Sequence, residues 1–344
     1  MEDGKYVDGS IWIYAPNKGA PIFFAIAYAA TGVWHAWQAA HYKSWKLTGL
    51  YVFCAFLFVG GFILRGLGAF DYKKIIYYIV SICLVYAAPP LYELSNYHIL
   101  GRILYLVPYH SPIHPGRVLT TFAAVSLIVE TLSGIGASYV SNPTLPEKML
   151  HTGQALLKAA LILQLVVVTL FVTLAATFQR RCLKNGINNT KVNQALLTLY
   201  ISSAIITVRC IYRTVEFFDI DNMNFASPDF DPSTLGPILR YEWFFYVFEA
   251  TLMLLNSVLL NVRHPRRWLP ETTKVYLAKD GVTEIMGPGY KEDRNIVATL
   301  LDPFDLYGMI KGRDGKTRFW DENNSENSEN REGKPFIAPA PTTV

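Results

Sequence analysis

Apolar runs of about twenty residues recur along the first three quarters of the chain, separated by short polar loops. A helix needs about 20 apolar residues to cross the hydrocarbon core of a bilayer, and in lipid only helices and closed barrels satisfy every backbone polar group. The pattern therefore predicts an all-α membrane protein, a bundle of seven transmembrane helices. We expect these helices at residues 21–41, 47–66, 75–97, 118–140, 153–178, 194–217 and 238–262.

Composition supports a membrane-embedded bundle. Of 344 residues, 51% are hydrophobic and 17% are charged, which favours one such bundle over two soluble domains. The net charge of +4 comes without a long basic block, so nucleic acid is not an expected partner. Four cysteines without a CxxC pair indicate buried thiols rather than a metal site.

Basic residues predict the direction of the spans, because cytoplasmic loops carry an excess of Lys and Arg. Basic residues follow the first, third, fifth and seventh runs, whereas the loop "DIDNMNFASPDFDPS" before the last run has four aspartates and no base. We therefore expect the N-terminus outside and the C-terminus in the cytoplasm. The basic residues are Lys43, Lys46, Arg102, Arg117, Arg180, Arg181, Lys184, Lys191, Arg263, Arg266 and Arg267.

The division of the chain follows from these spans. Residues 1–20 are expected to form a short extracellular segment and residues 21–262 the transmembrane domain. Within a cytoplasmic segment at 263–315, "KVYLAKDGVTEIMG" predicts a hairpin turning at Asp280-Gly281, a dipeptide that supplies positive φ angles. The polar, proline-bearing residues 316–344 are expected to be a disordered tail.

Charged residues inside the last two spans constrain the bundle most, since a charge facing lipid costs at least a few kcal/mol. On the sixth span they follow i, i+3, i+4, i+7 spacing and on the seventh i, i+4, i+7 spacing, which places each set on one helical face. The two faces are expected to meet, with arginines held by carboxylates. The members are Arg209, Tyr212, Arg213 and Glu216 on the sixth span and Glu242, Tyr246 and Glu249 on the seventh.

Three further charges, Arg65, Glu130 and Lys158, fall in the outer halves of other spans, so that four positive side chains meet four negative ones. Two interpretations stay open. The network fixes helix register, as buried ion pairs often do, or it lines a polar cavity, open toward the outer leaflet, that receives a lipid headgroup. Both interpretations require paired charges, because an unpaired buried charge is costly.

The histidines do not predict a metal site. A catalytic zinc ion needs three converging ligands, and the last three spans contain no histidine. We therefore expect no metal and no cofactor. His35 and Glu93, with Pro89 and Pro90, are candidates for a smaller polar feature in the inner half; for Glu93 a hydrogen bond to a neighbouring helix is favoured.

At these residues the chain resembles the fungal lipid-translocating exporter family, seven-span proteins linked to aminocholesterol resistance and release of sphingoid long-chain bases. "RCIYRTVEF" is similar to the family's Arg-x-x-Tyr-Arg-x-x-Glu pattern, and "YEWFFYVFEATLM" carries the matching acidic positions. His35, "GFILR" and Gln164 are weaker matches. Where the family often has a glutamate in the second span this chain has Phe58, and Glu130 stands in for one lost acid.

The resemblance implies a plasma-membrane or endomembrane protein that moves or responds to amphiphilic lipids. The leading hypothesis is a lipid transporter whose outer cavity binds a headgroup, rather than an enzyme. The alternatives are a seven-span lipid sensor whose tail, from Arg263 onward, contacts cytosolic partners, and an intramembrane hydrolase. As a transporter, the chain is expected to bind lipid through the charged residues above together with His35.

Overall fold

The computed structural model describes Trp12, Tyr14, residues 16–71, 74–140, 145–221 and 236–287, and Asp302, Tyr307 and Ile310. The segment before Trp12, most of the acidic loop and the tail at 316–344 lie outside the described residues, so the expectations for them stay predictions.

Long helices make up most of the described chain. Several extend well beyond the predicted spans, because hydropathy marks only the part of a helix that can lie in hydrocarbon. The helix that contains Pro89 and Pro90 continues through both. The long helices are α1 (Gly19–His41), α2 (Trp45–Phe70), α3 (Ile75–Leu106), α4 (Pro115–Val140), α5 (Glu147–Lys184) and α6 (Thr190–Asp221), with a 3-10 turn η1 (Pro108–His110) between α3 and α4.

The last predicted span, 238–262, is not one regular helix. A short α7 (Pro237–Arg240) ends at Tyr241, whose φ of −108° and ψ of 118° are extended. The chain then continues as α8 (Trp243–Phe245), a π-helical segment η3 (Tyr246–Thr251) and α9 (Leu252–Val262), followed by the 3-10 turn η4 (Pro265–Arg267). Hydropathy alone did not reveal this break, since the stretch is apolar on average despite Arg240, Glu242 and Glu249.

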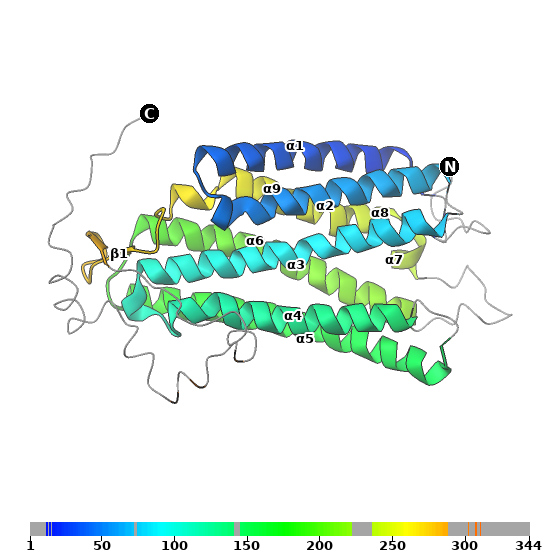
Figure 1. The fold of residues 1–344 in the computed structure, drawn as a ribbon. Helices are drawn as coiled ribbons and strands as arrows, with labels where there is room; N and C mark the ends of the chain where they lie inside the picture. The colour runs from blue at the N-terminus through cyan, green and yellow to red at the C-terminus, as the bar shows by residue number, and fades with distance from the viewer. Residues whose placement is uncertain are drawn as a thin grey trace.

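The helices lie side by side along a common axis (Figure 1). α1 packs on α2 and α9, α2 on α3, and α4 on α5, while α6 contacts α3, α5 and α9. In Figure 1, α1, α2 and α9 form the upper part of the bundle and the α4–α5 pair forms the lower part, with α3 and α6 between them. The second half of α6 crosses behind the space between α3 and α4.

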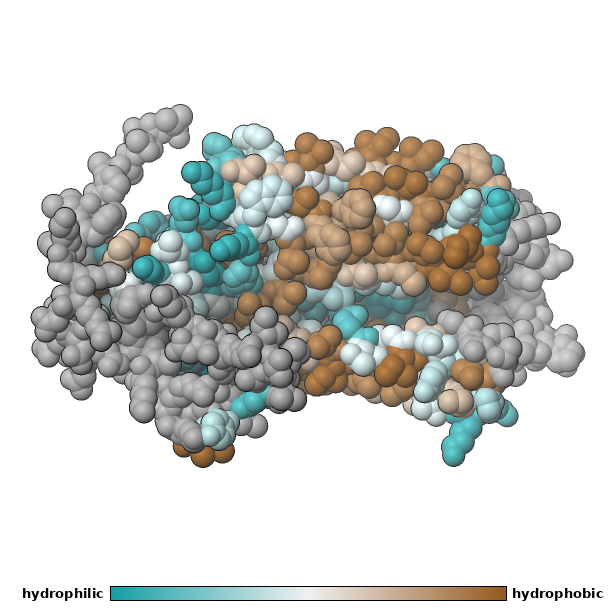
Figure 2. Space-filling view, in the orientation of Figure 1, coloured by the Kyte–Doolittle hydropathy of each residue, from teal (hydrophilic) through white to brown (hydrophobic). Residues whose placement is uncertain are grey.

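Burial is distributed as in a membrane protein. Large apolar side chains cover the outside of the bundle, among them Val33, 71% exposed, and Phe56, 69% exposed, and Figure 2 shows a broad hydrophobic surface along the helices. Charged side chains such as Arg65, Arg209 and Glu249 are buried inside. Among the residues that the structure describes, six helical stretches are long and apolar enough to cross a bilayer: α2, α3, α4, α5, most of α6, and the stretch Trp243–Arg267. The chain is therefore an integral, multi-pass membrane protein.

The α4–α5 pair is in backbone contact at two glycines. A Cβ added at Gly136 would lie 2.8 Å from the Gly153 carbonyl oxygen, and one at Gly153 would lie 2.7 Å from Cβ of Tyr139. Side chains at either glycine would separate the helices. This contact holds α4 and α5 together as one unit.

A small hairpin follows the bundle. β1 (Val275–Leu277) pairs antiparallel with β2 (Glu284–Met286), with Tyr276 opposite Ile285. In the turn, Gly281 has a φ of 72°, whereas the expected positive φ at Asp280 is absent. Asp280 instead accepts hydrogen bonds from Thr283 and Val282, which lower the pKa of its carboxyl.

The glycine contact generates a stability prediction. Gly136→Val should lower the free energy of unfolding by about 1–3 kcal/mol, the usual cost of overpacking. Gly134→Val is the matched control, because nothing lies within 4 Å of a Cβ at Gly134 on the same helix. Thermal unfolding in detergent measures both variants, and equal midpoints would contradict the close approach of α4 and α5.

Candidate functional site

Arg65 and Glu242 form an ion pair near one end of the bundle. Arg65 Nη2 donates to Glu242 Oε1 at 2.8 Å, and the two side chains are 3% and 6% exposed. Arg65 Nε donates to the Tyr246 hydroxyl at 3.3 Å, and Glu242 Oε2 accepts from the Asn17 backbone N–H at 2.7 Å. The pair therefore joins α2, the start of α8 and the segment before α1.

Arg209 and Glu249 form the most deeply buried pair. Arg209 Nε donates to Glu249 Oε1 at 2.7 Å, and the side chains are 6% and 0% exposed. Glu249 also faces Arg213. Because breaking such a pair leaves an uncompensated charge in a low-dielectric interior, it couples α6 firmly to η3.

Arg213 and Glu216 form a third pair, one helical turn further along α6. Arg213 bonds Glu216 and donates to the Tyr86 hydroxyl of α3 at 2.8 Å, while the Tyr212 hydroxyl donates to Glu216 at 3.0 Å. The side chains of Arg213 and Glu216 are 19% and 12% exposed. This pair is therefore more accessible than the other two.

The acidic side chains of the last span belong to an irregular stretch rather than to one regular helix. Glu242 lies at the N-cap of α8, before the helix proper, and the π-helical η3 begins at Tyr246 and contains Glu249. The wider π turn shifts the side chains that follow it, and the Tyr28 hydroxyl donates to the Ala250 carbonyl within η3 at 2.8 Å. Glu242 and Glu249 consequently serve two separate ion pairs.

A fourth polar cluster contains a carboxyl that forms no ion pair with any residue in the described part of the chain. Glu93 of α3 is 4% exposed, and its two oxygens accept from Gln164 Nε2 of α5 at 2.9 Å and from the Tyr97 hydroxyl at 3.2 Å. Ser126 of α4 donates to the Tyr97 oxygen at 3.2 Å. Sequence reasoning did not select this cluster as the site, although Glu93 and Tyr97 have i, i+4 spacing and Gln164 interrupts an apolar run. His35, the partner considered for Glu93, lies elsewhere.

Glu130 does not join the paired network as expected. Glu130 of α4 is exposed and makes no ion pair among the residues that the structure describes, yet Arg209 and Glu93 both act on it electrostatically. Lys158 of α5 is half-buried, with Nζ 5.4 Å from the centre of the Phe218 ring. Glu130 therefore faces the space between its own helix, α3 and α6.

That space is a lateral groove. Figure 2 shows the surface hollowed between α3 and α4, with hydrophilic atoms at its floor and hydrophobic side chains on both sides. We call this hollow the lateral groove. The polar cluster that we assign to it in the proposals below consists of Ser126, Glu130, Gln164, Arg213, Glu216 and Glu93.

His35 is remote from the ion pairs. Its Nε2 lies 3.1 Å from the Ser257 hydroxyl, and Gln38 Nε2 donates to the Asn261 carbonyl at 2.8 Å, so both side chains join α1 to α9. Within the described part of the chain, no group of three or more His, Cys, Asp or Glu side chains is arranged to hold a metal ion. The structure thus separates His35 from the charged residues with which sequence reasoning grouped it.

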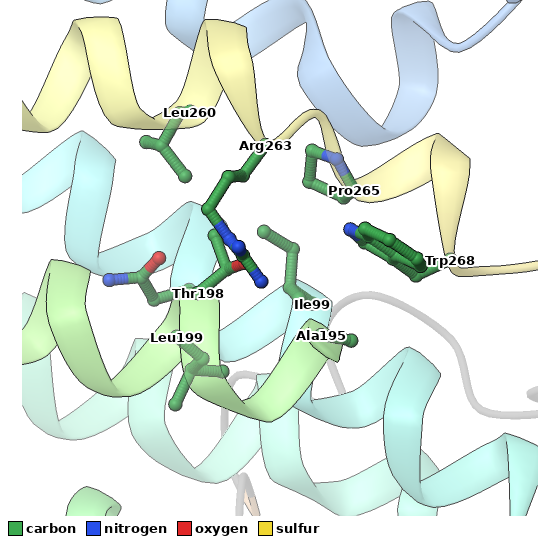
Figure 3. A pocket seen from close by; sticks show the side chains of 9 residues that line it. Ile99, Ala195, Thr198, Leu199, Leu260, Arg263, Pro265 and Trp268 are labelled. Atoms are coloured by element: carbon green, nitrogen blue, oxygen red, sulfur yellow. The ribbon is translucent and has the colours of Figure 1, made fainter. Parts of the chain in front are cut away.

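A pocket between α3, α6 and α9, at the end nearest the hairpin, is lined mainly by apolar side chains (Figure 3). Arg263 points into it and donates to Thr198 Oγ1 at 2.8 Å and to Gln194 Oε1 at 2.5 Å. Leu260, Pro265 and Trp268 surround the guanidinium. Because its arginine is already hydrogen-bonded to α6, we interpret the pocket as part of the packing between helices rather than as a headgroup site.

Comparison with known proteins identifies relatives of the chain. The model of a family described as RTA1 like protein matches residues 51–272. The chain is 43% identical, over 88% of its length, to a lipid-translocating exporter-like protein RTA1 of Leptosphaeria maculans, of which the match spans 60%. It is 30% identical over 65% of its length to protoporphyrin uptake protein 1 of Saccharomyces cerevisiae, covering 73% of that protein.

A third relative is a probable lipid transporter of Emericella nidulans, 24% identical over 76% of this chain and 69% of its own length. The chain thus spans less than two thirds of the Leptosphaeria relative. No solved structure matches it significantly.

The buried pair generates the second prediction. Glu249→Ala should cost about 3–5 kcal/mol of stability by leaving Arg209 unpaired, whereas Arg209→Met combined with Glu249→Leu should recover most of that loss. Thermal unfolding of purified protein measures both.

Glu284→Ala is the control, because Lys191 and Glu284 are also 2.7 Å apart but have side chains 54% and 41% exposed. Exposed pairs contribute at most about 1 kcal/mol. A Glu249→Ala loss as small as the Glu284→Ala loss would show that the buried pair does not couple α6 to η3.

Proposed function

The chain belongs to the RTA1-like protein family, and from that premise we propose that it translocates or exports amphiphilic lipids rather than catalysing a reaction. The cargo is a lipid with a polar headgroup and an apolar body, such as a sphingoid long-chain base or a sterol-like amphiphile. Relatives named as lipid-translocating exporter-like protein and probable lipid transporter support this proposal.

The proposal rests mainly on the presence of the lateral groove. A lipid can keep its chain among the exposed apolar side chains of α3 and α4 while its headgroup enters the polar base of the groove (Figure 2). The cost of moving a headgroup across hydrocarbon falls when polar groups replace its water. A groove that opens sideways into the bilayer therefore suits a lipid better than a soluble solute.

The charge of the groove favours a cationic headgroup. Glu216 and Glu249 are ion-paired with arginines, but Glu93 and Glu130 have no ion-pair partner among the described residues. A protonated amine can bind two carboxylates and also donate hydrogen bonds to them. Glu93 and Glu130 are the headgroup ligands in this proposal, and Arg213 and Glu216 line the approach.

We further propose that α1 is a seventh span and that the N-terminus is outside. With 23 residues α1 is long enough to span hydrocarbon at about 1.5 Å per residue, and it lies alongside α2 (Figure 1). Several basic residues lie at helix ends and turns near the hairpin: Arg102, Arg181, Arg263 and Arg266. Under the positive-inside rule, they support a cytoplasmic location for this end of the bundle. The plasma membrane is the proposed location.

A lipid sensor is the second candidate, supported by contacts between the bundle and the segment after it. Asn189 Nδ2 donates to the Gly281 carbonyl at 3.0 Å, and Arg102 Nη2 donates to the Pro270 carbonyl at 2.8 Å. With the Lys191–Glu284 pair, these bonds hold the hairpin against α3 and α6. If lipid binding moves α6, these contacts would displace the hairpin and so change the binding of a cytosolic partner to the tail.

Accessibility of the termini tests the topology. A tag placed before Met1 should be cleaved by protease added to intact cells, and a tag after Val344 should be cleaved only after permeabilisation. The reason is that the basic residues keep the loops they flank, and the C-terminus with them, in the cytoplasm. Immunoblotting measures the protected fraction. The opposite pattern would reverse the proposed orientation of the groove.

Lipid movement by purified protein in liposomes tests transport. Glu130→Gln should slow translocation of a fluorescent single-chain amine about tenfold, which corresponds to roughly 1.4 kcal/mol and the loss of one charge-assisted hydrogen bond. Glu147→Gln is the control, because that glutamate is an exposed side chain in the first turn of α5, away from the groove. Dithionite quenching of the outer leaflet measures the rate.

Equal rates for Glu130→Gln and Glu147→Gln would remove Glu130 from the path. A sensor is favoured instead if the wild type binds the amine and its hairpin changes in protease protection, but no lipid moves.

A further inference from the structure

We propose that Glu93 is a proton-exchange site that couples lipid movement to a proton gradient. When a cationic headgroup enters the lateral groove, Glu93 releases a proton and binds the headgroup; when the headgroup leaves, Glu93 is protonated again. Outward movement of the lipid is thereby exchanged for inward movement of a proton. This inference rests on the proposed translocation of lipid and adds its energy source.

The partners of Glu93 distinguish it from the other buried carboxyls. Glu242, Glu249 and Glu216 each contact an arginine, so their negative charge is balanced at all times. Glu93 accepts hydrogen bonds only from an amide and a hydroxyl among the described residues, and both donors are neutral. A buried carboxylate without a cation is costly. A proton on Glu93 would remove this cost, and in this proposal Glu93 carries one while the groove contains no cation.

The charges around Glu93 favour exchange over permanent ionisation. Arg209 is the arginine that acts on it, but Arg209 is already bonded to Glu249. Glu130 adds a second carboxyl from α4, and like charges near each other disfavour simultaneous ionisation. The groups that face Glu93 are Arg209 and Cys210 of α6, Glu130 of α4, Gln164 of α5 and Tyr97 of α3.

A cationic headgroup reverses this balance. Placed between Glu93 and Glu130, it supplies the positive charge that both carboxylates lack, so that the proton on Glu93 is displaced. Proton and headgroup then compete for the same carboxyl. Because of this competition, the groove can open to either side of the membrane with either the proton or the headgroup bound. Exchange of a proton for a lipid requires both of these states.

Two hydroxyls form a route for the proton. Ser126 Oγ donates to the Tyr97 oxygen at 3.2 Å, and the Tyr97 hydroxyl donates to Glu93 Oε2 at 3.2 Å. The Tyr97 ring is held by Phe122 and Phe171, with centroids 5.2 and 5.0 Å away. Tyr97 is buried, whereas Ser126 is half-buried on α4. The chain of hydroxyls therefore runs from the groove to the buried carboxyl.

The transfer balances atom for atom. A hydronium ion in the groove gives a proton to the Ser126 oxygen and becomes water, Ser126 passes its own proton to Tyr97, and Tyr97 passes its proton to Glu93 Oε2. Each hydroxyl ends with one hydrogen, and the carboxylate becomes a neutral carboxylic acid. Release of the proton follows the reverse order. Tyr97 is a relay and positioning residue, whereas Glu93 binds the proton and the headgroup.

Proton release on binding tests the inference directly. Dodecyltrimethylammonium, whose quaternary nitrogen carries no exchangeable proton, is added to the full-length protein in nanodiscs in weakly buffered solution, and a pH indicator counts protons per bound molecule. The wild type should release up to one proton, Glu93→Gln none, and Glu147→Gln as many as the wild type. Tyr97→Phe should keep the stoichiometry but slow the release, a result that a merely structural role for Tyr97 would not give.

Measurements on the wild type alone can overturn the proposal, whether or not the variants fold. Binding of the quaternary amphiphile without proton release, at equal affinity across pH 5 to 8, would overturn the proton-exchange site. Empty nanodiscs correct for partition of the amphiphile into lipid.

Proteoliposomes separate the coupling from the transport itself. A fluorescent trimethylammonium amphiphile should accumulate about tenfold per unit of pH gradient in a one-for-one exchange, the concentration ratio that equals the proton ratio. Movement that ignores the gradient would refute the coupling and leave lipid translocation standing. A wild type that moves no amphiphile under any gradient would refute the translocation, and the coupling with it.

Discussion

The ion pair between Arg209 and Glu249 is the interaction on which the rest of the site depends. It joins α6 to the π-helical η3 with a 2.7 Å hydrogen bond between side chains that are almost fully enclosed. In hydrocarbon neither charge is tolerated alone, so the two helices must stay together. The position of α6 in turn decides where Arg213 and Glu216 meet the groove and which cation acts on Glu93.

The buried carboxyls divide into two kinds, and this division separates structure from proposed function. Glu242 and Glu249 are enclosed with arginines, and their role is to hold helices. Glu93 and Glu130, the proposed headgroup ligands, have no ion-pair partner in the described part of the chain. Fixed pairs stabilise a scaffold, whereas an uncompensated carboxyl can exchange one positive occupant for another. The two interpretations of the charged network, register and binding, thus apply to different residues.

Membership of the RTA1-like family agrees with this arrangement but does not by itself choose the cargo. One relative is named for lipid translocation and another for protoporphyrin uptake. A groove with apolar sides and a polar base accommodates amphiphiles of different shape, since it need contact only the polar part closely. In the proposed function, the carboxyls of Glu93 and Glu130, rather than the shape of the groove, favour a cationic headgroup.

The amino-acid sequence determined the helical class of the protein, the positions of its long apolar helices and the presence of paired charges within them, because hydropathy and helical spacing are local properties. It also identified the residues of the ion pair on α6 and those that approach it from the last span. Only the tertiary structure decided that Glu242 and Glu249 serve separate arginines, because the packing of α2 and α6 against this irregular stretch places a different arginine beside each carboxylate. It also decided that His35 packs against Ser257 and that Glu93 meets Gln164, Tyr97 and Ser126, since contacts between distant helices depend on how those helices pack rather than on any spacing along the chain.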